Sequence, residues 1–175
     1  MEKFSLFYGK LLAGLALAAC ALLFLMTLMI CADVLLRNVP LIPGVQGLAW
    51  SNEVSEAMLF LITMLTAPWL LRRGQHIRVD ILLRAIPKKI GWYCEWISDV
   101  LALVCCVAMF VYGCKAVGAS YAGGSLSIKT LVTPEWWLLA PLPVAFLLLA
   151  VELVFRMQRL HLGERAPRDD AVSAG

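Results

Sequence analysis

The longest uncharged run of the chain, residues 11–32, constrains the fold more than any other feature of the sequence. At a rise of roughly 1.5 Å per residue, a helix of these 22 residues extends about 33 Å, enough to cross a hydrocarbon core of roughly 30 Å. Inside lipid, backbone N–H and C=O groups can be satisfied only within a helix or a closed barrel. The run therefore predicts a transmembrane helix.

The composition extends this prediction to the whole chain. Its 175 residues are 62% hydrophobic and 15% charged, whereas a soluble domain has roughly 45–50% apolar and about 25% charged residues. We therefore expect an all-α integral membrane protein with four transmembrane helices, over about 11–36, 52–71, 91–118 and 134–155. These spans form a single domain over residues 1–163, and the tail 164–175 is expected to be disordered.

The positions of Lys and Arg predict the orientation. Twelve of the 15 lie in the N-terminal segment, in the connection after the second span or in the C-terminal tail; the other side has Arg37, Lys115 and Lys129. Because cytoplasmic segments carry the excess of basic residues, both termini are expected in the cytoplasm. Tryptophan rings prefer membrane surfaces, and we expect them at the outer surface for Trp50, Trp136 and Trp137 and at the inner surface for Trp69 and Trp92.

The second span has acids at one end and a basic cluster at the other. Ser51 or Asn52 is a suitable N-cap, which would place Glu53 and Glu56 in the first turn and on one helix face. Two interpretations stay open for these acids: favourable charges at a helix start, or partners for a cation on another chain. At the far end, Arg72 and Arg73 stop the span at the membrane surface.

An amphipathic helix is expected after the second span, over about 76–87. Gly74 suits the left-handed position that ends a helix, and Pro87 would end the next one. The apolar residues from Ile77 to Ile86 fall on one helix face. Such a helix would lie in the cytoplasmic membrane surface, with its basic residues at lipid headgroups: Arg78, Arg84 and Lys88.

The segment RRGQHIRVDILL, which follows an acid-led second span, resembles the small membrane subunit of tripartite ATP-independent periplasmic (TRAP) transporters, the DctQ-like family. The entry to the fourth span, TPEWWLLAPLPVAF, is similar to the family as well. The resemblance covers roughly residues 10–155 and is most specific at Arg73, Gly74, His76, Val79 and Asp80. One departure is Asn52, where members often have a second acid.

The resemblance implies a complex in the inner membrane of a bacterial cell, with a large membrane subunit that carries the substrate and the coupling sodium ions. A periplasmic binding protein would deliver an organic acid, such as a C4-dicarboxylate, sialic acid or a similar carboxylate. This chain would be an accessory scaffold without a cofactor of its own. We expect structural or partner-binding roles for Glu53, Glu56, Arg72, Arg73, Gly74, His76, Asp80 and Asp99.

Charged residues within the spans give a second hypothesis. Asp33 and Arg37 are four residues apart and are expected to pair, as are Glu152 and Arg156. Asp99 lies about 13 Å inside the third span if that helix enters lipid near residue 90, and Glu95 lies one turn earlier on the same face. These two acids could contact another helix or subunit, or could supply the ion site of a self-sufficient oligomeric transporter or channel.

The fourth span has its own start and a break. Thr133 is expected to cap it, with Pro134 and Glu135 in the first turn. Pro141 and Pro143 remove backbone hydrogen bonds, so a kink is expected there. The glycine-containing segment 121–127 that precedes it is interpreted as an outer loop.

Other function classes lack the residues that they need. The sequence shows no phosphate-binding glycine loop, no nucleophile with a suitable base, and no metal-ligand spacing, so we expect neither an enzyme nor a nucleic-acid partner. A disulfide-oxidising protein needs a cysteine pair near the outer surface, where Cys114 stands alone. The segment LALAAC ending at Cys20 resembles a lipoprotein cleavage box, but the apolar run continues past it, so cleavage is not expected.

Overall fold

A computed structural model describes residues 2–38, 47–73, 88–128 and 130–162. It has the long helices α1 (Glu2–Asn38), α2 (Ser51–Arg72), α4 (Lys88–Gly123) and α6 (Pro141–Leu162), the short helix α5 (Glu135–Leu139), and the strands β1 (Leu126–Ile128) and β2 (Val132–Pro134). Four segments are long and apolar enough to cross a membrane, which confirms the four predicted spans: Leu6–Asn38, Ser51–Arg72, Ile90–Gly123 and Glu135–His161. The predicted amphipathic helix over 76–87 and the predicted disordered tail 164–175 lie outside the described residues.

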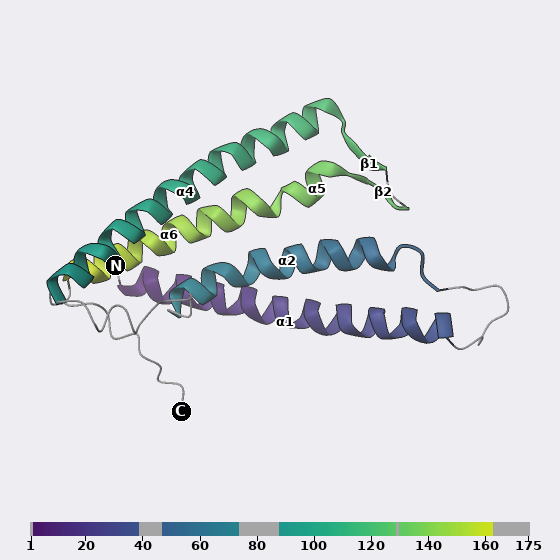
Figure 1. The fold of residues 1–175 in the computed structure, drawn as a ribbon, viewed down its shortest axis with the longest axis horizontal. Coiled ribbons are helices and arrows are strands. Elements are labelled where there is room, and N and C mark those ends of the chain that lie inside the picture. Colours follow the sequence, from purple (N-terminus) through teal and green to yellow (C-terminus); the bar gives the residue numbers. More distant parts are fainter. Residues whose placement is uncertain (1, 39–46, 74–87, 129, 163–175) are drawn as a thin grey trace.

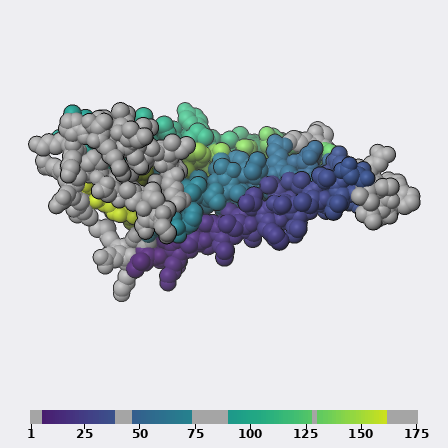
Figure 2. Space-filling view, turned by 60° about the horizontal axis from the view of Figure 1, so that its bottom comes forward, coloured from purple at the N-terminus to yellow at the C-terminus, as the bar shows by residue number. Residues whose placement is uncertain are grey.

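The long helices pack side by side in the order α1, α2, α6, α4, because the main helix contacts are α1 with α2, α2 with α6, and α6 with α4 (Figure 1). Figure 2 shows α1 along one margin of the molecule, with α2 between it and the later helices. We call the end where α1 and α4 begin the terminal end, and the opposite end, where β1 and β2 lie, the hairpin end.

This arrangement leaves much apolar surface uncovered. Leu17 on α1 and Val104 on α4, the two outer helices, have 74% and 60% of their surface exposed. A small apolar core lies between α2, α4 and α6, formed by Leu71, Cys106 and Leu153. Helices in lipid gain little from burying apolar side chains against one another, since the lipid tails are equally apolar. The exposed surface is therefore suited to lipid or to another membrane subunit.

The fourth span is broken where the prolines predicted a kink. Helix α5 ends at Leu139, and α6 begins at Pro141, whose missing N–H interrupts the backbone hydrogen-bonding pattern. Pro143 is buried against α4, where Gly113 permits the close approach. A Cβ at Gly113 would lie 2.7 Å from Leu142 Cδ2 and 3.4 Å from Pro143 Cδ.

The segment between α4 and α5 differs from the predicted loop. Residues 121–123 still belong to α4, Gly124 turns the chain with φ +60°, and β1 pairs antiparallel with β2 in the register Ser127 to Thr133. The expected Thr133 cap is wrong, because Thr133 lies in β2 and Pro134 is the N-cap of α5, without a side-chain cap. A three-residue strand has too few residues for a recognisable period, which is why the sequence did not reveal it.

The start of α2 also differs in detail. Trp50 is the N-cap, without a side-chain cap hydrogen bond, so the expected cap at Ser51 or Asn52 is wrong. The N–H of Ser51 instead bonds to the carbonyl of Leu48 at 3.0 Å. Glu53 is the acid of the first turn, and Glu56 comes too late to belong to it.

Candidate functional site

A fully buried carboxylate marks the terminal end. Glu152 of α6 has no exposed surface, and its Oε2 accepts a hydrogen bond from Arg72 Nη1 of α2 at 3.2 Å. Its Oε1 accepts one from Arg159, two turns later on α6. Both carboxylate oxygens therefore have a guanidinium partner, as a charge buried this deeply requires.

Helix α1 makes room for the Arg72 side chain. A Cβ at Gly9 would lie 2.9 Å from Arg72 Nη2, so the absence of a side chain there allows the guanidinium to pass α1. The Tyr8 ring lies 5.9 Å from Arg72 Cζ, within cation–π range. The Tyr8 hydroxyl donates to the carbonyl of Leu148 at 2.7 Å, which fastens α1 to α6.

A second buried ion pair joins α4 to α6. Arg156 Nε lies 3.2 Å from Oδ1 of Asp99, whose residue surface is 2% exposed. Glu95 is buried one turn earlier on α4. The predicted pair of Glu152 with Arg156 is wrong: Glu152 binds Arg72 and Arg159, and Arg156 reaches across to Asp99. We call Arg72, Glu95, Asp99, Glu152, Arg156 and Arg159 the terminal charge cluster.

The terminal charge cluster is balanced in charge. Three guanidinium groups accompany three carboxylates, so their formal charges sum to zero. A cation site would need a surplus of carboxylate charge or free oxygen ligands. Within the described ranges, no group of three His, Cys, Asp or Glu side chains is arranged to hold a metal ion. The cluster is therefore built to connect all the long helices, with Tyr8 and Gly9 supplying the α1 side.

A second polar contact connects the helices at the hairpin end. Glu53, in the first turn of α2, accepts the backbone N–H of Thr130 at 2.6 Å and that of Leu131 at 2.9 Å. Both donors belong to the turn between β1 and β2. The structure thus adds a third role to the two interpretations of this acid, because the carboxylate binds backbone N–H groups of its own chain. We call this the hairpin contact.

The predicted pair of Asp33 and Arg37 is confirmed, with Arg37 Nε 2.9 Å from Asp33 Oδ2. The other oxygen of Asp33 accepts the N–H of Leu48 at 2.6 Å, which fixes the approach to α2 against the end of α1. Gly47 has φ +94°, and a Cβ there would lie 2.7 Å from Arg37 Cγ and 2.9 Å from Asp33 Oδ1. Glycine is therefore required for the chain to pass over this pair.

The remaining predicted residues are distributed between the two ends. Arg73 covers the Trp69 ring with its Cζ 4.6 Å from the centroid, and Trp92 donates to the carbonyl of Leu160, so these tryptophans lie at the terminal end. Trp50 and the edge-to-face pair of Trp136 and Trp137 lie at the hairpin end. Glu56 is exposed there.

Lys88 begins α4. Five predicted residues lie outside the described ranges: Gly74, His76, Arg78, Asp80 and Arg84.

Sequence reasoning missed Tyr8, Gly9 and Arg159 as parts of the terminal charge cluster. Tyr8 and Gly9 carry no charge, and each is an ordinary residue in a transmembrane helix. Arg159 is one of the twelve basic residues that the charge pattern assigns to the inner side of the membrane. The available signal was Glu152 itself, since an acid within an apolar span requires partners.

Comparison with known proteins agrees with this architecture. Residues 26–161 match the family described as "Tripartite ATP-independent periplasmic transporters, DctQ component". The chain is also similar to the "Sialic acid TRAP transporter permease protein SiaT" of Haemophilus influenzae (strain 86-028NP), with 26% identity over 110 residues. That region is 62% of this chain but 17% of the relative, so the chain spans a minor part of that longer permease. Because the family match covers most of the sequence, the chain belongs to the DctQ component family of TRAP transporters.

Proposed function

We propose that this chain is the small scaffold subunit of a sodium-coupled TRAP transporter that imports an organic acid. In this proposal a large membrane subunit carries the substrate and the sodium ions, and a periplasmic binding protein delivers the substrate. The acid would be a sialic acid, a C4-dicarboxylate or a similar carboxylate. The likeness to part of a longer sialic acid permease supports a partner subunit that supplies the rest of such a permease.

The observation that carries the scaffold role is the mutual neutralisation of the buried charges. Arg72 and Arg159 share Glu152, and Arg156 binds Asp99, so these groups hold helices together. A transport site is typically formed by broken helices and polar groups near the middle of the membrane. The break between α5 and α6 is flanked by Leu139 and Pro141, which offer no charged ligand.

The exposed outer helices support the same role. The side chains uncovered on α1 and α4 are large and apolar, for example Phe24 at 66% and Leu101 at 64% exposed. A rigid layer with two such faces can pack on a larger membrane protein and still present the other face to lipid. The long helices would enlarge the fixed part against which a large subunit moves.

Co-purification and uptake test this proposal. We expect a much larger polytopic protein to co-purify with the tagged chain in a fixed ratio. In liposomes under a sodium gradient, the chain alone should give no uptake of labelled sialic acid or C4-dicarboxylate, whereas the complex with the large subunit and binding protein should transport one of them. Uptake by the chain alone, lost in Asp99→Asn, would instead establish a self-sufficient transporter.

The orientation is part of the proposal and has its own test. With both termini in the cytoplasm, Asn38 would lie near the periplasmic surface and Gln75 near the cytoplasmic one. Single cysteines introduced at these two positions in a cysteine-free background should differ in labelling by an impermeant maleimide added to intact spheroplasts. We expect Asn38→Cys to react and Gln75→Cys to react only after permeabilisation; the reverse pattern would invert the topology.

A further inference from the structure

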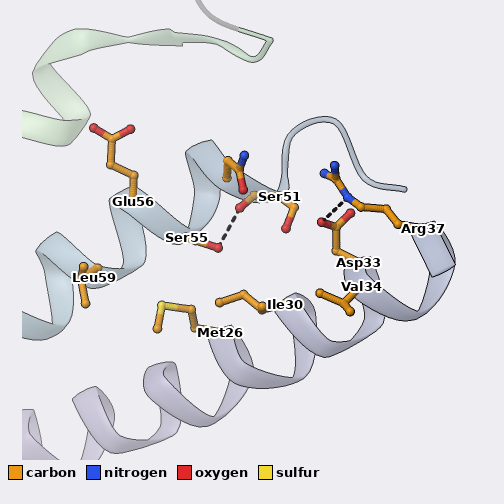
Figure 3. A pocket seen from close by; sticks show the side chains of 10 residues that line it. Met26, Ile30, Asp33, Val34, Arg37, Ser51, Ser55, Glu56 and Leu59 are labelled. Carbon is orange, nitrogen blue, oxygen red and sulfur yellow. Dashed lines mark hydrogen bonds and ion pairs between the residues drawn. The ribbon is translucent and has the colours of Figure 1, made fainter. Parts of the chain in front are cut away.

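A groove between α1 and α2 at the hairpin end has an apolar floor and a charged mouth (Figure 3). Its volume is about 670 Å³. Met26, Ile30 and Val34 follow one another along α1, and Leu59 of α2 faces them. Asp33 and Arg37 lie at the mouth on α1, and the α2 side of the mouth is polar, with Ser51, Asn52, Ser55 and the carboxylate of Glu56. Such a surface is suited to a molecule with an apolar chain and a charged head.

The guanidinium at the mouth is held in place by its neighbours. Arg37 uses Nε to bind the buried Asp33, and Asp33 is held in turn by the N–H of Leu48. Gly47 passes directly over both side chains. Among the described residues, the two terminal nitrogens of Arg37 make no hydrogen bond or ion pair, and its side chain is 48% exposed. Two oriented N–H₂ groups match a phosphate, which accepts bidentate hydrogen bonds from arginine.

The length of the groove matches one leaflet of a bilayer. Met26 lies eleven residues before Arg37 on a continuous helix, which corresponds to roughly 16 Å at about 1.5 Å per residue. Half of a hydrocarbon core is about 15 Å. A phosphate at Arg37 therefore places an acyl chain along Val34, Ile30 and Met26, where the groove is apolar.

From this geometry we propose that the groove between α1 and α2 binds one phospholipid, with its phosphate on Arg37 and an acyl chain against Met26, Ile30 and Leu59. The bound lipid would complete the contact between α1 and α2 at the hairpin end, on the side of the membrane where the chain carries few cations. This site does not depend on the transport function proposed above. It is also separate from the terminal charge cluster, which lies at the opposite end of the helices.

Native mass spectrometry of the full chain, released from detergent with added phosphatidylethanolamine or phosphatidylglycerol, tests the proposal. We expect one tightly retained phospholipid per chain. Arg37→Ala should weaken its affinity by at least about tenfold, because the loss of even one of the two charge-assisted hydrogen bonds corresponds to a change of that size. Leu59→Trp should fill the groove and displace the lipid while Arg37 remains in place, so the two variants probe the head and the chain separately.

Two controls make the result specific. Lys115→Ala removes another exposed cation, from the half of α4 nearer the hairpin end, where the Lys115 ammonium lies 5.6 Å from the Tyr112 ring centroid. Leu17→Trp adds the same bulk to a highly exposed position of α1 outside the groove. Both should retain the lipid as the original chain does. Equal loss in a control, or retention by Arg37→Ala and Leu59→Trp, would refute the site. If the purified complex of the original chain contains no phospholipid, and the Arg37→Ala chain no longer co-purifies with the large subunit, then the groove binds that subunit and not a lipid.

Discussion

Arg72 at the end of α2 and Glu152 in α6 are 80 residues apart in the sequence, yet Arg72 Nη1 lies 3.2 Å from Glu152 Oε2. This ion pair connects the two helix hairpins, because α2 packs with α1 and α6 packs with α4. Glu53 makes the corresponding connection at the hairpin end, through the turn between β1 and β2. Helices that gain little from apolar burial in lipid are thus fixed at both ends by polar groups.

Replacing Glu152 should destabilise the whole protein. Glu152→Gln removes the charge that balances Arg72 and Arg159, and leaving a buried ion partly unpaired costs about 3 kcal/mol of unfolding free energy. Thermal unfolding in detergent, followed by tryptophan fluorescence, measures the loss. Gln158→Ala, at an exposed position of the same helix, is the control and should unfold much as the original chain does. A Glu152→Gln protein as stable as that control would show that the cluster does not hold the helices.

The two arginines that bind Glu152 should contribute unequally to the stability of the protein. Arg72 has 21% of its side chain exposed and crosses from another helix, whereas Arg159 is 50% exposed and lies on the same helix as Glu152. Arg72→Gln should therefore lower the unfolding temperature more than Arg159→Gln, because a solvent-screened pair contributes little. Equal shifts in the same unfolding assay would contradict this ranking.

Asp99 and Arg156 should be energetically coupled. A double-mutant cycle with Asp99→Asn and Arg156→Gln should give a coupling free energy of roughly 0.5–3 kcal/mol, the range for contacting residues. For the sodium-coupled transporter proposed above, Asp99→Asn should leave the sodium dependence of uptake unchanged. An altered sodium dependence without loss of stability would point to an ion site at Asp99.

The hairpin contact should be visible in amide hydrogen exchange. Glu53→Gln weakens the acceptor of the Thr130 and Leu131 N–H groups, so both amides should exchange faster, with helix α4 unchanged. Asn52→Ala, at the neighbouring exposed position of α2, should leave both rates as they are. Unchanged exchange in Glu53→Gln would mean that the β1–β2 turn is held by other contacts.

Replacement by alanine should have opposite effects on stability at two of the glycines. Gly47→Ala forces a side chain into a backbone with φ +94° and against Arg37, at a cost of about 1–3 kcal/mol. Gly14 lies within α1 with open space around its Cβ position, so Gly14→Ala should be neutral or stabilising by up to about 1 kcal/mol. The unfolding temperatures of the two variants, measured in the same detergent, compare them directly. A Gly47→Ala protein with an unfolding temperature as high as that of Gly14→Ala would contradict the strained turn.

The sequence by itself determined the spans, the break in the fourth span and the pair of Asp33 and Arg37. Each follows from a local rule: apolar length, the missing N–H of Pro141, and the four-residue spacing on a helix. The family likewise could be recognised from short segments, and the match over residues 26–161 confirmed it.

Tertiary structure alone decided where the other charges go. Glu152 and Arg156 have the same four-residue spacing as Asp33 and Arg37, yet they do not pair, because neighbouring helices offer Glu152 the guanidinium of Arg72 and offer Arg156 the carboxylate of Asp99. Asp33 lies at the margin of the layer, on α1, where its own helix supplies the guanidinium. Glu53 likewise accepts a hydrogen bond from a backbone N–H group more than seventy residues away in the sequence. Local spacing sets which partners are possible, and the order in which helices lie side by side sets which of them are reached.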